Sequence, residues 1–277
     1  MYLHYDSLLF PGGLRRAFTL SYDDGVRQDI RLAEIFRKYG VKCTFNLNSA
    51  LFGDRPEGGN ARLEESEIDE VYAGQEIGGH GLYHSALDTV GEPLSVYEII
   101  EDKRRLERHS ALPLKMFAYP FGRFDGRVVG QLRSAGYRGA RTVRSTASFD
   151  LPADFLCWDP TCHHADPRLP ELTQRFLEDS GSGAKLFYVW GHAYEFDGAD
   201  NWDVIETLCR TVSERRDSVW FCTNGELLRY VEAYRALEWF TDGERVWNPS
   251  AVDVWLGSVR GRGDAVKIPA GGVGSLK

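Results

Sequence analysis

The stretch AFTLSYDDG, residues 17–25, decides the fold of this chain of 277 residues. Its first six residues predict a short apolar strand, and the Asp-Asp-Gly that follows ends it. The next apolar side chains recur at spacings of three and four, as on one face of a helix: Leu32, Ile35, Phe36 and Tyr39. Gly40 lies where a helix end favours a left-handed residue, and alternation from Val41 predicts a second strand. The segment is therefore a β-α-β unit.

The same alternation of strand and helix continues along the chain. Further strands are predicted at residues 76–80, 115–119, 137–142, 185–191 and 219–223. Helical patterns lie between them, and Ser95 with Glu98 is predicted to open one helix as a capping box. Seven or eight strands alternating with helices indicate a parallel sheet closed into a barrel. An open, doubly wound sheet is the alternative, but no GxGxxG follows the first strand, so a dinucleotide site is not supported.

The pattern changes after about residue 235. Residues 237–240 and 245–247 predict two strands of a hairpin, because Asp242-Gly243 between them adopts a tight turn at little cost. Residues 252–256 and 266–268 could add two more strands. We therefore expect residues 1–235 to form the barrel and residues 236–277 to form a small β-rich C-terminal appendage over one barrel face.

Composition excludes several classes of partner. Lys and Arg total 33 against 41 Asp and Glu, a formal net charge of −8, so no nucleic-acid partner is expected. No apolar run approaches the roughly 18 residues of a membrane span, and we recognise no secretory signal, so no membrane partner is expected. The five cysteines have no CxxC spacing and are predicted to be reduced thiols, which favours the cytoplasm. A homo-oligomer stays possible.

Two adjacent carboxylates, Asp23 and Asp24, stand at the end of the first predicted strand. Catalytic residues of a parallel barrel gather at such strand ends. Neighbouring carboxylates repel each other unless their roles differ. A bound cation separates the roles, because one carboxylate binds the metal while the other stays free as a base. The alternative is a turn that only caps the next helix.

Two histidines, His80 and His84, follow the predicted strand that ends near residue 80. Imidazoles four residues apart can bind one ion if the chain between them curls tightly. With Asp24 they form a set of two histidines and one carboxylate that leaves positions for water and substrate. Zinc suits this set best, although cobalt, nickel, iron and manganese are chemically reasonable. Paired surface histidines are the alternative.

Other side chains are candidates for the same cleft. His192 follows the most apolar predicted strand and could be a general acid, because the pKa of imidazole lies near neutrality; a core histidine is the alternative. His163 and His164 could contact the substrate or form a solvated loop pair. Glu195 could orient His192 or cap the next helix. Trp158 is a candidate stacking ring, with a core position as the alternative.

Five short motifs resemble, in order, those of the polysaccharide deacetylase family (NodB homology, similar to carbohydrate esterase family 4). They are residues 19–25 (TLSYDDG), 80–84 (HGLYH), 117–122 (FAYPFG), 158–159 (WD) and 191–192 (GH). The first three are similar to the family's T-F-D-D-G, H-[ST]-x-x-H and R-x-P-Y-G. The alternation of strands and helices extends the match to about residue 235. The resemblance implies a distorted (β/α) barrel of about seven parallel strands and a divalent metal ion.

The resemblance also implies a role for each matched residue. Asp24, His80 and His84 are the implied metal ligands. Asp23 is the implied catalytic base, which would accept a proton from the attacking water. His192 is the implied general acid, which would protonate the leaving amine.

Five further positions are predicted to contact the substrate or the oxyanion of the tetrahedral intermediate. The backbone N–H of Phe121 matches a position that helps to hold the oxyanion in the family. The other predicted contacts are Tyr119, Trp158, His163 and His164.

The chain departs from the family motifs at two positions. Ala118 stands where an Arg usually tethers the catalytic Asp. Asp23 should therefore be more basic, unless Arg123, Arg141 or another cation replaces that partner. Gly81 stands where a Ser or Thr usually supports the loop between the histidines. Neither change removes an implied metal ligand.

The resemblance implies a metal-dependent hydrolase that removes an acetyl group from an N-acetylated or O-acetylated sugar or polysaccharide. One alternative is an amidase of the same fold that acts on a small amide, at a non-sugar C–N bond; the expected cytoplasmic location favours it, since cell-wall glycans lie outside the cytoplasm. The other is a non-catalytic carbohydrate-binding relative. The presence of all five implied metal-binding and catalytic side chains argues against that second alternative.

Overall fold

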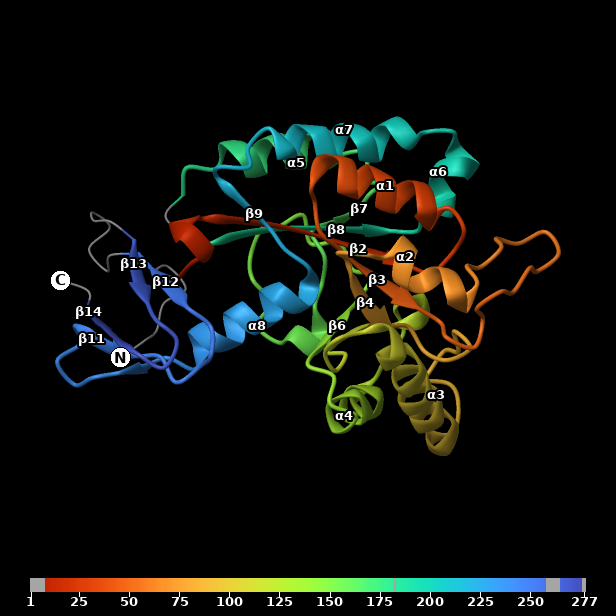
Figure 1. Ribbon diagram of the computed structural model, residues 1–277, viewed down its shortest axis with the longest axis horizontal. Helices are drawn as coiled ribbons and strands as arrows, with labels where there is room; N and C mark the ends of the chain where they lie inside the picture. The colour runs from red at the N-terminus through yellow and green to blue at the C-terminus, as the bar shows by residue number, and fades with distance from the viewer. Residues whose placement is uncertain (1–7, 182, 258–264, 276–277) are drawn as a thin grey trace.

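A curled parallel sheet forms the centre of the molecule (Figure 1). The structure is a computed structural model that describes residues 8–181, 183–257 and 265–275. Within these residues the strands lie in the order β6-β5-β4-β3-β2-β8-β7. Their bounds are β2 Arg16–Asp23, β3 Cys43–Leu47, β4 Glu76–Gly79, β5 Met116–Ala118, β6 Gly139–Arg141, β7 Cys162–His163 and β8 Lys185–Gly191. This sheet confirms the predicted distorted (β/α) barrel of about seven parallel strands.

The two edges of the sheet approach each other through the segment that precedes β7. The Trp158 N–H donates to the Ala140 carbonyl at 3.0 Å, and the Thr142 N–H donates to the Trp158 carbonyl at 2.9 Å. Trp158 thereby pairs in parallel with β6, and β7 pairs in parallel with β8 four residues later. One more strand, β9 (Val219–Phe221), pairs with the first residues of β2. The segment from Trp158 to β7 therefore connects the β6 edge with the β8 edge, and the sheet curls into an irregular barrel.

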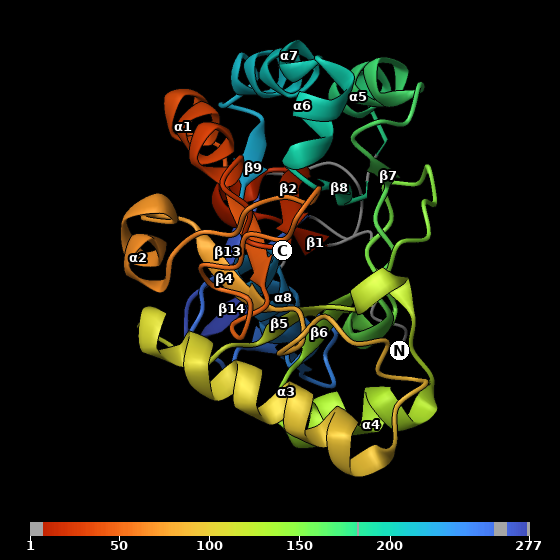
Figure 2. The same cartoon turned by 90° about the vertical axis from the view of Figure 1, so that its right-hand side faces the viewer.

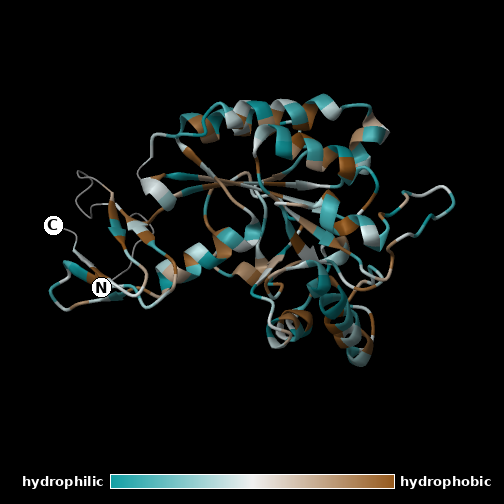
Figure 3. Cartoon of the chain, viewed as in Figure 1, coloured by the Kyte–Doolittle hydropathy of each residue, from teal (hydrophilic) through white to brown (hydrophobic). Residues whose placement is uncertain are grey.

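Helices cover two sides of the sheet, with α1, α5 and α7 on one side and α3 and α4 on the other (Figure 2). The bounds are α1 Asp29–Tyr39, α2 Ile68–Val71, α3 Glu92–Leu106, α4 Gly126–Ser134, α5 Leu169–Glu178, α6 Tyr194–Ala199, α7 Trp202–Ser213 and α8 Asn224–Arg235. The long helices carry both hydrophobic and hydrophilic residues (Figure 3), and the apolar face of α1 predicted from its spacing is buried apart from Tyr39. Short 3₁₀ turns lie at Pro11–Gly13, Glu65–Glu67, Glu107–His109, Pro120–Gly122 and Phe155–Cys157.

One of the two helix ends predicted from the sequence is observed, and a further helix has a cap of its own. Gly40 ends α1 in the left-handed conformation, with φ of 61°. Thr223 and Glu226 form a capping box at the start of α8. The predicted capping box at Ser95 and Glu98 is wrong, because α3 begins earlier, at Glu92. Both side chains instead lie inside the helix and face neighbouring elements.

The residues after α8 form two small antiparallel sheets. One contains β10 (Glu238–Trp239), β11 (Arg245–Trp247) and β14 (Val273–Ser275), and the other contains β12 (Val254–Leu256) and β13 (Val266–Ile268). The N-terminal strand β1 (Leu8–Leu9) completes the second sheet by pairing with β12. The C-terminal β appendage is therefore present, with a contribution from the N-terminus. The domain boundary at residue 235 stays a prediction.

The appendage packs against α8 and the N-terminal ends of the barrel strands. Its side chains Val254 and Leu256 belong to one buried apolar cluster with Ala17, Met116 and Leu186, which lie at the beginnings of β2, β5 and β8. The opposite ends of the strands are left for other side chains. None of the described helices is both long and apolar enough to cross a membrane.

Candidate metal centre and catalytic site

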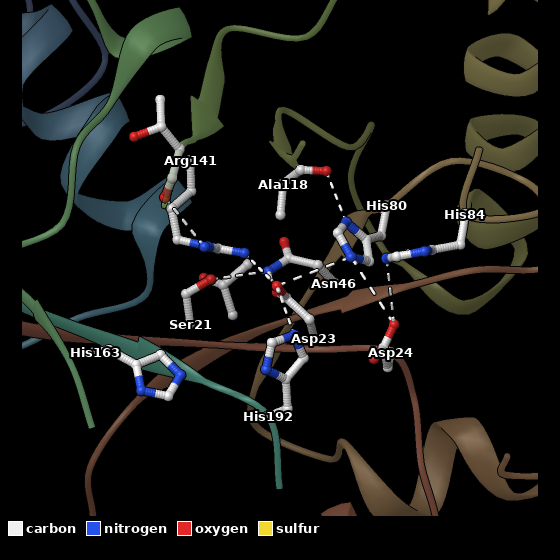
Figure 4. A network of polar contacts seen from close by, with 12 residues as sticks. Ser21, Asp23, Asp24, Asn46, His80, His84, Ala118, Arg141, His163 and His192 are labelled. Atoms are coloured by element: carbon white, nitrogen blue, oxygen red, sulfur yellow. Dashed lines mark hydrogen bonds and ion pairs between the residues drawn. The ribbon is translucent and has the colours of Figure 1, made fainter. Parts of the chain in front are cut away.

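The candidate side chains meet where the parallel strands end (Figure 4). Asp23 and Arg141 are the last residues of β2 and β6, and His80 and His192 directly follow β4 and β8. These segments are far apart in sequence, but parallel pairing brings their C-terminal ends to one side of the sheet. The expected location of a barrel site is thus observed.

Asp23 is almost completely buried and has polar partners on several sides. Its Oδ1 accepts a hydrogen bond of 2.8 Å from Asn46 Nδ2, and its Oδ2 forms an ion pair with Arg141 Nη2. His80 Nε2 and His192 Nε2 each lie 3.9 Å from Oδ2. Burial alone would raise the pKa of Asp23, but these charges, chiefly that of Arg141, outweigh burial and lower the pKa to about 2.

Arg141 takes the place of the Arg that the third motif lacks. Ala118 and Arg141 are register partners on the adjacent strands β5 and β6, so the guanidinium reaches Asp23 from one strand further along the sheet. The guanidinium also lies over the Trp190 ring, 4.2 Å from its centroid. The other sequence candidate, Arg123, pairs with Asp88. Asp23 is therefore less basic than an untethered carboxylate, and not more basic.

Asp24, His80 and His84 bring three potential metal-binding atoms together. Their ligand atoms all lie within 4.8 Å of one another. His80 Nε2 is 3.9 Å and His84 Nε2 is 3.7 Å from Asp24 Oδ1. This oxygen is buried and accepts no hydrogen bond from the described residues, although Arg62 Nη1 lies 3.2 Å away. The charge of Arg62 offsets part of the cost of burying this oxygen, and a metal ion would supply the partner that hydrogen bonding does not.

The protonation states of both histidines suit a metal ligand. His80 Nδ1 is 2.7 Å from the Ala118 carbonyl and donates to it, so the lone pair is on Nε2, which faces Asp24. Burial lowers the pKa of His80. Burial and the neighbouring His80 lower the pKa of His84 to about 4. Both imidazoles are therefore neutral near pH 7, the form that binds a metal ion, and the set fits a divalent cation.

Two buried acids of α3 support the loop that carries the histidines. Asp102 accepts hydrogen bonds from the His80 N–H at 3.2 Å and from Ser49. One turn earlier, Glu98 accepts from the Tyr83 N–H at 2.9 Å and from Ser85 Oγ at 2.6 Å. These contacts replace the Ser or Thr that the second motif lacks at position 81.

Sequence reasoning missed Asp102 and misassigned Glu98 to a helix cap. The available signal was a pair of acids four residues apart on a helix that otherwise buries apolar side chains such as Ile99. Gly81 adopts a φ of 77°, which strains residues with a side chain. Gly81 has no side chain that could support the loop, so the support comes from Asp102 and Glu98 of α3.

Three predicted site residues adopt a backbone conformation that is uncommon outside glycine. Asp24, His84 and Phe121 have φ of 86°, 59° and 57°. Strained conformations of this kind gather at functional sites, where the surrounding structure holds them. The Phe121 side chain is 62% exposed and its ring packs edge-on against His84, with centroids 4.4 Å apart. Phe121 thus lies beside the candidate metal centre.

His192 faces Asp23 on one side and Glu195 on the other. Its Nδ1 is 3.3 Å from Glu195 Oε1, and its backbone N–H donates to Glu195 Oε2 at 3.1 Å. Burial opposes protonation, but the contact with Glu195 and the charge of Asp23 outweigh it and raise the pKa of His192. His163 and His164 also contact Glu195, so they lie on the far side of His192 from the candidate metal ligands.

Two predicted substrate contacts lie in the core. Tyr119 is 1% exposed, its hydroxyl donates to the Leu156 carbonyl at 2.8 Å, and its ring stacks on Phe124. Trp158 is also 1% exposed and packs against Phe155 and Tyr188. Neither side chain presents a surface to a ligand, because strand geometry turns both away from the site.

Comparison with known proteins supports the motifs. Residues 13–140 match the family model described as polysaccharide deacetylase. Comparison with the curated proteins found no match. The fold and the site define a (β/α) barrel protein with a candidate metal centre at the C-terminal ends of its strands. Residues 13–140, which carry the first three motifs, are thus similar to the polysaccharide deacetylase family, as the motifs predict.

Solved structures share this fold at low sequence identity. A family 4 carbohydrate esterase from Streptomyces lividans, in complex with acetate, is 15% identical over 75% of this chain and 92% of that one, with a TM-score of 0.51. A mutant of the peptidoglycan deacetylase PdaC from Bacillus subtilis is 15% identical over 80% and 93%, with a TM-score of 0.51. A third match, the Streptococcus pyogenes deacetylase PplD in complex with acetate, is 21% identical over 45% of this chain and 55% of that one, and its TM-score of 0.41 is too low to show a shared fold. This chain therefore spans about half of that last protein.

Proposed function

We propose that this protein is a metal-dependent deacetylase that removes an acetyl group from an N-acetylated or O-acetylated sugar or polysaccharide. One observation carries the proposal: the buried Asp24 Oδ1 lacks a hydrogen-bond donor among the described residues and faces the Nε2 atoms of His80 and His84. The match of residues 13–140 to the polysaccharide deacetylase family supports the reaction class.

Asp24, His80 and His84 would hold the metal ion. Two imidazoles and a carboxylate suit zinc best, and cobalt, nickel, iron and manganese are alternatives. When bound, such an ion polarises the acetyl carbonyl and lowers the pKa of a water molecule. The tautomer of His80, set by the Ala118 carbonyl, orients the Nε2 lone pair for this purpose.

Asp23 acts as the base in this proposal. Its low pKa keeps the carboxylate ionised throughout the neutral range, so it can accept a proton from the attacking water. Asn46 and Arg141 hold its two oxygens in place.

His192 acts as the acid. Its Nε2 lies 3.9 Å from Asp23 Oδ2, on the other side of that carboxylate from Arg141, and its raised pKa keeps the ring protonated closer to neutrality. Protonation of the leaving nitrogen is required when an amide breaks. The backbone N–H of Phe121 is the candidate donor to the oxyanion.

Acetate release from a panel of N-acetylated and O-acetylated sugars, with and without EDTA, tests the proposal. Release that stops with EDTA and returns with added zinc supports it. Ammonia or a ring-opened product from amides outside the sugar panel indicates the amidase alternative. Carbohydrate binding without any product, in protein that contains metal, indicates a non-catalytic relative and contradicts the proposal.

Metal analysis of purified variants tests the ligands directly. Asp24→Ala, His80→Ala and His84→Ala are each expected to reduce bound metal from about one ion per chain to near zero, because each removes one of three ligands. His109→Ala is the control, since this histidine pairs with Asp69 away from the site. Full metal content in the His84→Ala variant would contradict the assignment.

A further inference from the structure

A second cluster of ionisable side chains lies beside His192. It contains His163 at the end of β7, His164 after it, and Glu195 in the first turn of α6. His163 Nε2 is 3.1 Å and His164 Nε2 is 3.2 Å from the same oxygen, Glu195 Oε2. His164 is 2% exposed, between the rings of Tyr22 and Phe196. The three ligand atoms are close enough to hold a metal ion or to form hydrogen bonds.

The tautomers decide between these two possibilities. The Ala165 N–H donates to His163 Nδ1 at 3.1 Å, so Nδ1 carries a lone pair and the proton is on Nε2. A protonated Nε2 cannot bind a metal ion, but it can donate to Glu195. For His164, Nδ1 has no hydrogen-bond partner among the described residues, so a proton there would be a buried donor without an acceptor. Both histidines therefore suit hydrogen bonds to Glu195.

Glu195 thus receives several donors at once. Its Oε2 faces His163, His164 and the backbone N–H of His192. Its Oε1 lies 3.3 Å from His192 Nδ1, within ion-pair distance but outside hydrogen-bond geometry, and Nδ1 has no hydrogen-bond partner among the described residues. A carboxylate held at one oxygen by three groups has little freedom to move the other oxygen. Because Oε1 lies beside Nδ1 of His192, its position sets the orientation of the ring, with Nε2 towards Asp23.

We propose that Glu195 is a positioning residue that directs His192 Nε2 towards Asp23, and that His163 and His164 hold Glu195 in the required orientation. The inference rests on the proposed function insofar as His192 is the acid. It assigns the two histidines to the support of the acid rather than to substrate contact or to a second metal ion.

The charges around His192 agree with this role. The negative groups that face it are Glu195 of α6 and, at the end of β2, Asp23 and Asp24. The rings nearest to it are Tyr194, with centroids 5.1 Å apart, Trp190, at 5.7 Å, and His163 of β7, at 6.4 Å. Burial and the neighbouring His163 lower the pKa of His164 to about 3, so His164 is neutral and adds no opposing charge. Loss of Glu195 would leave only Asp23 and Asp24 to favour protonation of His192 against burial, so its pKa would fall.

Titration of the histidine ring nitrogens by NMR in the full-length, metal-loaded protein tests the proposal. The His192 signals are assigned by their loss in His192→Gln. In Glu195→Gln the pKa of His192 is expected to fall by about one unit, and kcat/KM by about 10- to 100-fold, as for other groups that orient a functional histidine. Glu34→Gln is the matched control, because it removes one carboxylate from an exposed face of α1.

Two variants of His163 separate the roles of donor and metal ligand. His163→Gln keeps a donor near the position of Nε2 and is expected to retain the His192 pKa, whereas His163→Leu removes the donor and is expected to lower it. Metal content should stay at about one ion per chain in both. These variants keep Glu195, so they test the proposal even if Glu195→Gln fails to fold.

An unchanged His192 pKa and tautomer in both Glu195→Gln and His163→Leu would overturn the proposal. A second metal ion that disappears in His163→Leu would also overturn it. Failure of the proposed deacetylase reaction would be seen separately, as absence of acetate release by the wild-type protein. The NMR titration gives its result whether or not a substrate is known.

Discussion

The two ends of the parallel sheet bury different kinds of side chain. At the C-terminal ends of the strands, Asp23, His80 and Arg141 are ionisable and almost fully buried. At the N-terminal ends, aliphatic side chains such as Leu186 belong to one buried apolar cluster with Leu256 of the appendage. One sheet therefore has an end held by charge and hydrogen bonds and an end held by apolar contact.

One partly buried acid and one buried acid, at opposite ends of the sheet, make the difference clearer. Glu76, at the start of β4, accepts hydrogen bonds from Thr44 Oγ1 at 2.6 Å and from the Gly225 N–H at 2.8 Å. At the other end, Asp24 Oδ1 accepts none from the described residues. Hydrogen bonds satisfy Glu76, whereas Asp24 Oδ1 has only the ion pair with Arg62 and can still accept a ligand. The difference indicates that the C-terminal end of the sheet is the end suited to binding a ligand.

The largest expected effect is on turnover, at the charged end. Asp23→Asn should reduce kcat by about 10²- to 10⁴-fold, because the amide cannot accept the proton, while metal content is retained. Steady-state kinetics with metal analysis measures both. Glu76→Gln is the control at the apolar end and should leave kcat unchanged. A near-normal rate in Asp23→Asn would mean that another group is the base.

Stability at the charged end should depend on the partner of Asp23. Arg141→Met is expected to lower the free energy of unfolding at pH 7 by about 3–5 kcal/mol, since it leaves a buried carboxylate without its cation. The exposed pair of Arg123 and Asp88 provides the control, and Arg123→Met should cost less than about 1 kcal/mol. Urea denaturation measures both variants.

The same pair predicts a dependence on pH. The folded-state pKa of Asp23 is lowered from 3.8 to about 2, so the pair stabilises the protein above pH 4 and this contribution is lost as the pH falls towards 2. The difference in unfolding free energy between wild type and Arg141→Met should therefore shrink below pH 4. A difference that is constant from pH 7 to pH 3 would show that the ion pair contributes nothing.

At the apolar end we expect a loss of stability without a change in the metal site. Leu256→Ala removes a fully buried side chain and should cost about 2–5 kcal/mol. Leu112→Ala, at a position that is 58% exposed, should change stability by less than about 0.5 kcal/mol. If Leu256→Ala also released the metal, the two ends would be coupled and the contrast between them would fail.

The smallest expected effect concerns the helix that joins the barrel to the appendage. The Thr223 side chain accepts a hydrogen bond of 3.1 Å from the Glu226 N–H at the start of α8. Thr223→Ala should cost about 1 kcal/mol, and Thr223→Ser should cost less because it keeps the acceptor. Thermal denaturation distinguishes them. Equal losses in the two variants would indicate that packing of the methyl group, and not the cap, is what matters.

Much of the fold could be predicted because its signals are local. The strand before Asp23-Asp24-Gly25, the helix ending at Gly40 and the strand at residues 185–191 each follow from a few neighbouring residues. The predicted capping box at Ser95 failed because tertiary contacts of Glu98 overrode a local pattern. The edge strand β7 is only two residues long, so it has no periodicity to detect.

The sequence by itself determined the alternation of strands and helices, the family motifs and the identity of the candidate metal ligands, since these depend on short stretches of chain. Only the tertiary structure decided that Arg141 replaces the missing tether, that Asp102 supports His80, and that His163 reaches Glu195. Each of these contacts joins residues more than 20 positions apart. Their geometry depends on strand register and helix packing, which no local pattern specifies.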